Sequence, residues 1–304
     1  MDQRTHKILT LFGLNASRIH KPSDAMLAQV FFVDDHYILR SRPYEEDTPV
    51  RFATECELCA HVAGLTGFRF PEYRRCLSGN HFVVDEGYFW TLHPLIPGRP
   101  LGRWFELHQI DPSVNRQVLK TLRQLHRMTT GCFDEKSIDR GRLLELIAPA
   151  MAEANDFLSV GALDRLRLAF DRVKRYCESY PPEKSCFVHG DFHHGNILVQ
   201  KGRIVGFIDL DWCRVGSFYE DFAFSLMMML RDYKNWSPEF QWSTYQSMLD
   251  DYDFQGDSVL LSDHLILYAL FDCAVFKASC FENATAFFKY QKRFLEAACR
   301  AELA

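Results

Sequence analysis

The stretch that most constrains the fold is residues 187–211, in which short apolar runs alternate with polar loops. Residues 189–196 form one polar loop, and residues 200–203 have the composition of a turn. The apolar runs are residues 187–188, 197–199 and 204–208. Short apolar runs bounded by turn residues are typical of strands. The stretch therefore predicts a strand, a polar loop and then a hairpin of two strands.

Three polar side chains adjoin these predicted strands. Asp191 and Asn196 lie on the loop before the hairpin, and Asp209 lies just beyond its second strand. Folding the hairpin brings its open end together, so all three side chains are expected to point into one site. Carboxylate and amide oxygens bind hard divalent cations, and a carboxylate can also receive a proton. The arrangement therefore suits a metal-assisted reaction on phosphate.

These polar segments also resemble a known family. His-Gly-Asp-x-x-x-x-Asn at residues 189–196, followed by Ile-Asp-x-Asp at residues 208–211, resembles the catalytic signature of the aminoglycoside phosphotransferase and choline kinase group. These are small-molecule kinases with the protein-kinase fold. The resemblance implies that Asp191 is the catalytic base and that Asn196 and Asp209 are magnesium ligands. It also implies ATP as donor and a small-molecule hydroxyl as acceptor, such as an aminoglycoside, choline-like or homoserine-like compound.

The same resemblance gives neighbouring residues supporting roles. Gly190 stands where protein kinases usually carry Arg, which favours the small-molecule branch. His189 is expected to order the loop, and Asp211 completes the second motif. A Gly-x-x-x-x-Asp-Phe-Ala segment that contains Asp221 is similar to a Gly-x-x-x-x-Asp-Leu-Ala segment of the family. Asp221 is therefore expected to open a helix over residues 222–230 and to order the catalytic loop.

The histidines of the loop allow another interpretation, a transition-metal cluster. His189, His193 and His194 lie close to Asp191 in the sequence. Three imidazoles without a wider ligand set are weak support for such a site, so we favour the phosphate-binding interpretation. His126, in a Leu-x-x-Leu-His element that also resembles the family, is expected to be a packed structural histidine.

Composition narrows the class of protein further. The chain has 304 residues, enough for two lobes, and its net charge of −5 gives no basic surface for nucleic acid or an anionic membrane. The first residues lack the apolar core of a signal peptide, and no apolar run is expected to span a bilayer, which predicts a cytoplasmic enzyme with no membrane partner. The ten cysteines are then expected to be reduced. Cys56-x-x-Cys59 lacks a second pair, so a zinc or redox role is not favoured.

The pattern of predicted elements indicates an α+β chain with a two-lobed, protein-kinase-like fold. Residues 1–95 are expected to form a small nucleotide-binding lobe on an antiparallel sheet, and residues 96–304 a larger, mainly helical catalytic and substrate-binding lobe. The expected strands of the first lobe are residues 26–33, 37–41, 82–84 and 88–92, and its expected helices are residues 3–14 and 50–63. The expected helices of the second lobe are residues 114–128, 139–156 and 161–180, with three helical stretches after residue 240.

Two charged residues of the first lobe are expected to serve the nucleotide. Arg40 lies on a predicted strand where kinases carry the Lys that holds nucleotide phosphates. Its guanidinium can grip phosphate oxygens in a bidentate way. The resemblance implies that Glu55, on the following helix, pairs with Arg40. Glu57 is the less favoured candidate for this role.

Thr91, Leu92 and His93 begin the segment that ends the first lobe. Two prolines and a glycine follow them, and these residues stiffen and turn the chain. The segment resembles the hinge of the family, where backbone groups meet adenine, so these three residues are expected to bind nucleotide. Residues 22–32 contain no glycine, unlike the Gly-x-Gly-x-x-Gly loop of protein kinases, so the residues that cover the phosphates are left unassigned.

Residues 217–263 are strongly acidic and bear on the choice of acceptor. They contain nine acidic residues against Arg231 and Lys234. The acidic residues are Glu220, Asp221, Asp232, Glu239, Asp250, Asp251, Asp253, Asp257 and Asp263. Carboxylates attract an amine over distance, and aromatic faces hold a cation at close range. The stretch therefore predicts an acceptor that carries a positive charge as well as a hydroxyl.

Two other functional classes stay open at this point. Gly-Asp-x-His at residues 190–193 and Gly-Asn-His at residues 79–81 are similar to pieces of metal-dependent phosphoester hydrolase motifs, but in reversed order. A nucleotide-binding pseudokinase is the second alternative, because the expected phosphate-covering segment is altered. Transfer of phosphate to a hydroxyl, release of phosphate from an ester, or neither, separates these classes.

Overall fold

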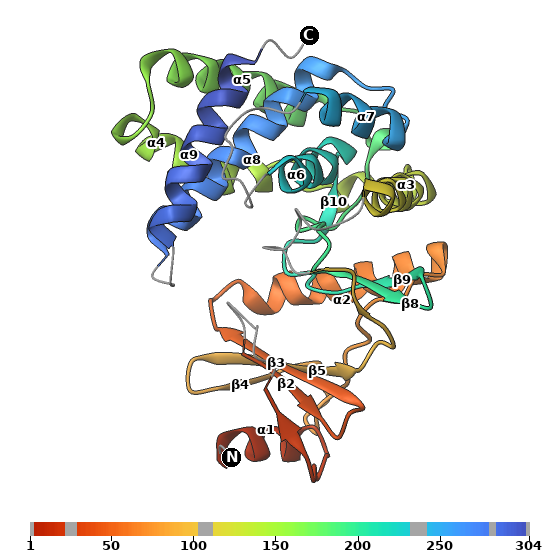
Figure 1. Ribbon diagram of the computed structural model, residues 1–304. Helices are drawn as coiled ribbons and strands as arrows, with labels where there is room; N and C mark the ends of the chain where they lie inside the picture. Colours follow the sequence, from red (N-terminus) through yellow and green to blue (C-terminus); the bar gives the residue numbers. More distant parts are fainter. Residues whose placement is uncertain (1–2, 22–28, 103–111, 232–241, 280–283, 302–304) are drawn as a thin grey trace. The chain divides into compact units, whose positions relative to one another are not determined.

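The structure, a computed structural model shown in Figure 1, describes residues 3–21, 29–102, 112–231, 242–279 and 284–301. The chain divides into two compact units. The first unit comprises residues 1–99 and 198–211, and the second comprises residues 100–197 and 212–304. A boundary at residue 95 alone would leave residues 198–211 with the second unit. The predicted hairpin that carries Asp209 instead belongs to the first unit.

An antiparallel sheet of five strands, in the order β1-β2-β3-β5-β4, is the centre of the first unit. The strands are β1 (Ile19–His20), β2 (Gln29–Val33), β3 (Tyr37–Pro43), β4 (Val83–Asp85) and β5 (Tyr88–Pro94). The helices of this unit are α1 (Gln3–Leu11) and α2 (Thr48–Thr66). The expected strands after residue 29 and both helices are present, and β1 is a short strand that the sequence reading missed.

The hairpin of β2 and β3 turns through two residues that suit it. Asp34 and Asp35 both have positive φ, 50° and 56°, as the tight turns between twisted antiparallel strands require. Aspartate tolerates this left-handed conformation better than most residues, which explains why the pair can occupy the turn without glycine.

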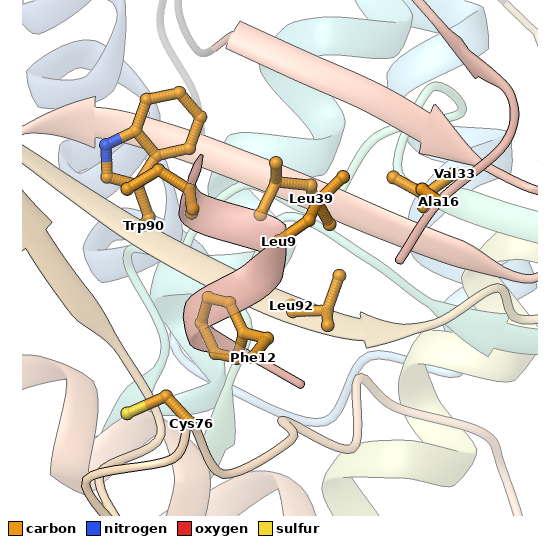
Figure 2. Close-up of a cluster of buried hydrophobic side chains, with 9 residues drawn as sticks. Leu9, Phe12, Ala16, Val33, Leu39, Cys76, Trp90 and Leu92 are labelled. Carbon is orange, nitrogen blue, oxygen red and sulfur yellow. The ribbon is translucent and has the colours of Figure 1, made fainter. Parts of the chain in front are cut away.

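Helix α1 covers one face of this sheet through an apolar stripe. Ile8, Leu9 and Phe12 are buried at helical spacing and pack with Trp90 and Leu92 of the sheet. Figure 2 shows this cluster, with Leu9 of α1, and Phe12 just after α1, close to Leu39 and Leu92. Burial of several large side chains, each contributing about 1.5–3 kcal/mol, makes the cluster the main core of the first unit.

A second, smaller sheet contains the predicted hairpin that leads to Asp209. Its strands are β6 (Arg99–Pro100), β8 (Ile197–Gln200) and β9 (Arg203–Phe207), in the order β6-β8-β9. Arg69 binds β9 through its backbone, because its N–H donates to Val205 O at 2.9 Å and its carbonyl accepts from Phe207 N at 2.9 Å. These bonds attach the predicted hairpin, and with it Asp209, to the chain that follows α2.

The second unit is mainly helical. Its helices are α3 (Pro112–Thr129), α4 (Arg142–Glu153), α5 (Val160–Ser179), α6 (Phe218–Leu230), α7 (Trp242–Tyr252), α8 (Ser258–Ala278) and α9 (Ala284–Arg300). Two short strands, β7 (Cys186–Val188) and β10 (Arg214–Gly216), pair antiparallel beside them. The start predicted for α6, after Asp221, was wrong. Ser217 caps the helix in a capping box with Glu220, so α6 begins one turn earlier.

Helix α8 forms the core of the second unit. Every residue from Leu260 to Leu270 is buried, and α8 packs against α4, α5, α6 and α9 (Figure 1). By length and composition α8 could cross a membrane, so the expectation that no apolar run is long enough was wrong. Two thirds of its apolar window, 67%, are buried inside the protein, which is how a central helix of a globular unit behaves.

The antiparallel-sheet unit and the mainly helical unit together confirm the predicted α+β class.

Candidate functional site

Arg40 is the centre of an ion-pair cluster in the first unit. Its guanidinium donates to both carboxylate oxygens of Asp211 at 2.8 Å, and to Asp209 Oδ1 at 2.7 Å. Burial by itself would lower the pKa of Arg40, but the charges of Asp209 and Asp211 outweigh burial and raise it. A permanently charged, bidentate donor therefore stands on β3, where the sequence placed Arg40, and its phosphate-binding role stays a prediction.

The partner predicted for Arg40 was wrong. Glu55 lies 3.8 Å from Arg42 and accepts a hydrogen bond from the hydroxyl of Tyr73, while the carboxylates that contact Arg40 are Asp209 and Asp211. Arg42 also bonds Asp211, so Asp211 bridges both arginines. Arg42 was missed, although β-strand alternation places it on the same face of β3 as Arg40.

Glu55, and not Glu57, is the buried acid of helix α2. The side chain of Glu55 is 4% exposed, whereas Glu57 is exposed. Burial, and then the charge of Asp211, raise the pKa of Glu55 to about 7. Glu55 therefore changes its charge near neutral pH, and the cluster changes its net charge with it.

The three residues expected at the hinge occupy β5 in different ways. Thr91 lies opposite Arg40 and lines a small cavity of about 10 Å³ with Arg40 and Tyr73. Leu92 is fully buried in the core, and its carbonyl accepts from Arg74 N at 2.7 Å. His93 Nδ1 bonds Pro94 O at 2.9 Å, and burial lowers the pKa of His93 to about 4, so its ring is neutral. The adenine contacts of this segment stay a prediction.

The loop of residues 189–196 in the second unit, which the sequence predicts to be the catalytic loop, follows β7. Asp191 and Asn196 lie together on it, because Asn196 Nδ2 donates to Asp191 Oδ2 at 2.8 Å and to Asp191 O at 2.9 Å. Burial alone would raise the pKa of Asp191, but the neighbouring His193, His189 and Asn196 lower it below its usual value. Asp191 is therefore a carboxylate at neutral pH and can act as a proton acceptor.

Each unit holds oxygen donors of the kind that suits a magnesium ion. Asn196 donates its amide hydrogens to Asp191. Its Oδ1 atom makes no hydrogen bond within the described part of the chain. In the first unit Asp209 contributes a carboxylate whose backbone has φ 64°, a left-handed conformation uncommon outside glycine. Oxygen atoms of carboxylate and amide type are what Mg²⁺ takes in proteins.

Asp221 holds the beginning of the catalytic loop. Its carboxylate accepts from His189 N at 2.6 Å and from Gly190 N at 2.7 Å, and its side chain is completely buried. His126 Nε2 lies 3.4 Å from the same carboxylate, and Tyr252 bonds the other ring nitrogen at 2.6 Å. Asp221 and His126 therefore have the structural roles that the sequence predicted for them.

Gly190 has a steric reason for standing where protein kinases carry Arg. Its φ is 82°, and a Cβ atom at this position would lie 2.6 Å from the Cβ of Trp212. The positive φ and the close approach of Trp212 each exclude a larger side chain at Gly190 unless the loop moves.

The transition-metal interpretation finds no support in the described residues. No group of three or more His, Cys, Asp and Glu side chains there is arranged to hold a metal. His194 bonds Asn115 at 2.8 Å, and the ring of His189 packs edge-on against Phe192. Cys56 and Cys59 lie on α2 and form no disulfide.

Most of the described acidic residues within 217–263 form ion pairs or hydrogen bonds inside the second unit. Buried Glu220 pairs with Arg214, and buried Asp263 pairs with Arg165 and Arg172. Asp251 pairs with Arg116, Asp253 pairs with Arg123, and Asp257 caps α8. Asp232 and Glu239 lie outside the described residues, as do residues 22–28 of the segment expected to cover the phosphates. The described acids therefore give little support for a cationic acceptor.

Solved structures of similar fold are phosphotransferases. The GDP and kanamycin complex of APH(2")-IIia matches with a TM-score of 0.70 at 13% identity, covering 97% of each chain. Spectinomycin phosphotransferase APH(9)-Ia, bound to ADP and spectinomycin, matches with a TM-score of 0.58 at 15% identity, covering 100% of this chain and 99% of that chain. Macrolide 2'-phosphotransferase MphH from Brachybacterium faecium matches with a TM-score of 0.55 at 16% identity, covering 96% and 95%. At these identities the likeness concerns the fold.

Sequence comparison identifies the family. Among curated proteins no sequence match is found. The profile of the phosphotransferase enzyme family matches residues 19–257, which include Arg40, Asp191, Asn196, Asp209 and Asp221. This match spans more than half of the chain and contains both polar clusters described above. The chain therefore belongs to the phosphotransferase enzyme family.

Proposed function

We propose that the protein transfers the terminal phosphoryl group of ATP, in a magnesium-dependent reaction, to a hydroxyl of a small molecule. The observation that carries the proposal is the pairing of Asp191 with Asn196 on one loop. This pairing leaves Asp191 Oδ1 and Asn196 Oδ1 without a hydrogen bond to any described residue. A base and a cation ligand side by side are the parts that phosphoryl transfer needs.

Asp191 orients the acceptor hydroxyl and takes its proton as the oxygen attacks phosphorus. Its ionised state at neutral pH suits this role. Asn196 and Asp209 are the oxygen ligands we propose for magnesium, which when bound would neutralise charge on the phosphates. Arg40 exchanges its carboxylate partners for phosphate oxygens. Catalysis would then be mainly positioning and charge stabilisation.

The donor and acceptor are proposed from the relatives. Two of the similar structures carry GDP or ADP, so both ATP and GTP are candidate donors. Kanamycin and spectinomycin are bound in two of them, so hydroxylated amines are the first acceptors to test. We propose a cytoplasmic enzyme that acts on a free small molecule.

The test is one phosphate assay with Asp191→Asn as its matched variant. The purified chain is incubated with Mg-ATP or Mg-GTP and a panel of aminoglycosides, choline-like amines, homoserine and neutral or acidic hydroxy compounds. Transfer to a hydroxyl supports the proposal. Release of phosphate from esters supports a hydrolase, and binding without either reaction supports a pseudokinase. Asp191→Asn should bind nucleotide normally and lose roughly two to four powers of ten in turnover. Near-normal turnover would remove Asp191 from the mechanism.

A further inference from the structure

We propose that His193 is a positioning residue that holds one oxygen of Asp191, so that the other oxygen alone meets the acceptor hydroxyl. The proposal rests on the proposed function, because it takes Asp191 to be the base. All groups involved lie on the loop of residues 189–196 in the second unit.

The hydrogen bond of Gly195 fixes the tautomer of His193. The backbone N–H of Gly195 donates to His193 Nδ1 at 2.9 Å. A ring nitrogen that accepts a hydrogen bond carries no proton, so the neutral imidazole has its hydrogen on Nε2. That atom lies 3.5 Å from Asp191 Oδ2. His193 therefore turns a donor toward this oxygen of Asp191.

Asn196 supplies the second donor to the same oxygen. Its Nδ2 atom has two hydrogens, which go to Asp191 Oδ2 at 2.8 Å and to Asp191 O at 2.9 Å. Asn196 Nδ2 also lies 3.2 Å from His193 Nε2. Both atoms are donors in this tautomer, and both face the same acceptor, Asp191 Oδ2. Asp191 Oδ1, in contrast, makes no hydrogen bond to any residue that the structure describes.

A carboxylate held at one oxygen presents the other in a fixed direction. Asp191 is 27% exposed and His193 is 12% exposed, so the ring shields the held oxygen while Oδ1 stays reachable. A base works only within hydrogen-bonding distance of the proton that it takes, and small displacements are costly. Loss of the ring would leave Asp191 held by Asn196 alone and would allow its two oxygens to exchange.

Two amide replacements of His193 separate this role from a merely structural one. The amide nitrogen of Gln approaches the position of Nε2 and can still donate to Asp191. The amide oxygen of Asn approaches the position of Nδ1 and can still accept from Gly195, but its side chain is too short to reach Asp191. The probe reaction is hydrolysis of Mg-ATP by the full chain, with water as the acceptor. We expect His193→Asn and His193→Ala to lose roughly tenfold to a hundredfold in kcat with little change in KM for Mg-ATP, and His193→Gln to retain most of kcat.

Gly195 offers an independent way to displace the ring. A Cβ atom on Gly195 would lie 2.7 Å from His193 Cε1 and 3.0 Å from Nδ1, so Gly195→Ala must move the imidazole. We expect Gly195→Ala to lose kcat as His193→Ala does, and to cause no further loss in the His193→Ala background. Gly161→Ala is the control, because a Cβ there meets nothing within 4 Å.

Nitrogen NMR of the unliganded wild-type protein tests the proposal without any reaction. Long-range proton–nitrogen spectra should show the Nε2–H tautomer of His193, and the Nδ1–H tautomer would overturn the proposal. Activity that survives in His193→Asn and is lost in His193→Gln would show that the ring serves only Gly195, and would also overturn it. An inactive Asp191→Asn with a fully active His193→Ala would refute this role alone. An active Asp191→Asn would remove Asp191 from the mechanism, and a wild type that transfers no phosphate would refute the proposed function.

Discussion

Replacing Asp221 by Asn should destabilise the second unit by about 3 kcal/mol at neutral pH and slow turnover. The carboxylate accepts from the backbone N–H groups of His189 and Gly190 at 2.6 and 2.7 Å. An asparagine keeps one oxygen for these donors and turns an amide NH2 toward the other. One buried backbone donor is then left without an acceptor where no water replaces it, since the Asp221 side chain is completely buried.

The magnitude follows from the kind of bond that is lost. A hydrogen bond to a charged group contributes about 1.5–3 kcal/mol, and an unsatisfied buried donor costs about 1–3 kcal/mol. A loss of about 3 kcal/mol corresponds to a fall in Tm of roughly 6–12 °C for a unit of about 200 residues. Because the same two donors begin the catalytic loop, kcat should fall together with stability.

The sign of the pH dependence gives a second readout. Burial alone would raise the pKa of Asp221, but the hydrogen bond and charge of His126 and the His189 backbone hold it below its usual value. A lowered pKa means that the ionised form stabilises the fold at pH values above the usual carboxyl pKa. This contribution is lost as the pH falls through the folded-state pKa. The difference in the free energy of unfolding between wild type and Asp221→Asn should therefore become smaller at acidic pH.

The assay is urea unfolding followed by circular dichroism at pH 7 and near pH 3. Asp164→Asn is the matched control, because Asp164 is 66% exposed and its ion pair among the described residues is with Arg167, at 3.3 Å. A loss in Asp221→Asn no larger than in this control, or a loss that is the same at both pH values, would refute the reasoning.

Three further variants test the cluster of the first unit and the turn of the loop. Arg40→Glu places a third carboxylate beside Asp209 and Asp211, so calorimetry should show no Mg-ATP binding, and intact affinity would make Arg40 only an internal ion-pair partner. Glu55 has a folded-state pKa of about 7, above its usual 4.5, so wild-type stability should fall as the pH rises from about 4.5 to 7. Glu55→Gln removes this fall and should be more stable above pH 7 by up to about 3 kcal/mol in urea titrations, and an unchanged pH profile would contradict the raised pKa. Gly190→Ala should lower the melting temperature, whereas Gly64→Ala, whose Cβ within helix α2 meets nothing within 4 Å, should leave it unchanged or raise it, and equal melting temperatures of the two would contradict the close approach to Trp212.

Local patterns were sufficient to predict most elements and the placement of Asp191 and Asn196 on one loop. The apolar runs around residues 187–208 became β7, β8 and β9, and the polar residues between them became a loop that pairs Asp191 with Asn196. This success has a physical reason, because strand periodicity and the spacing within one loop are short-range properties of the sequence.

Pairings between distant residues were less predictable. Arg40 and Arg42 lie 171 and 169 residues from Asp211, and no local pattern shows which arginine a carboxylate will meet. The start of α6 was misplaced because Asp221 resembles a capping residue, whereas the Ser217 and Glu220 pair makes the cap. The acidic stretch shows the same limit. Glu220 and Asp263 are neutralised by arginines that are distant in sequence or buried, and composition cannot show this.

The arginines of the first unit have a consequence for how an anion would be recognised. Arg40 and Arg42 face Asp209, Asp211 and Glu55, so the cluster is electrically neutral when Glu55 is protonated and carries one excess negative charge when it is not. A nucleotide would therefore meet no net positive field from this cluster at a distance. Recognition by these residues would be an exchange of counterions at contact. Phosphate would pair with the arginine, and a bound cation would pair with the carboxylate that the arginine releases.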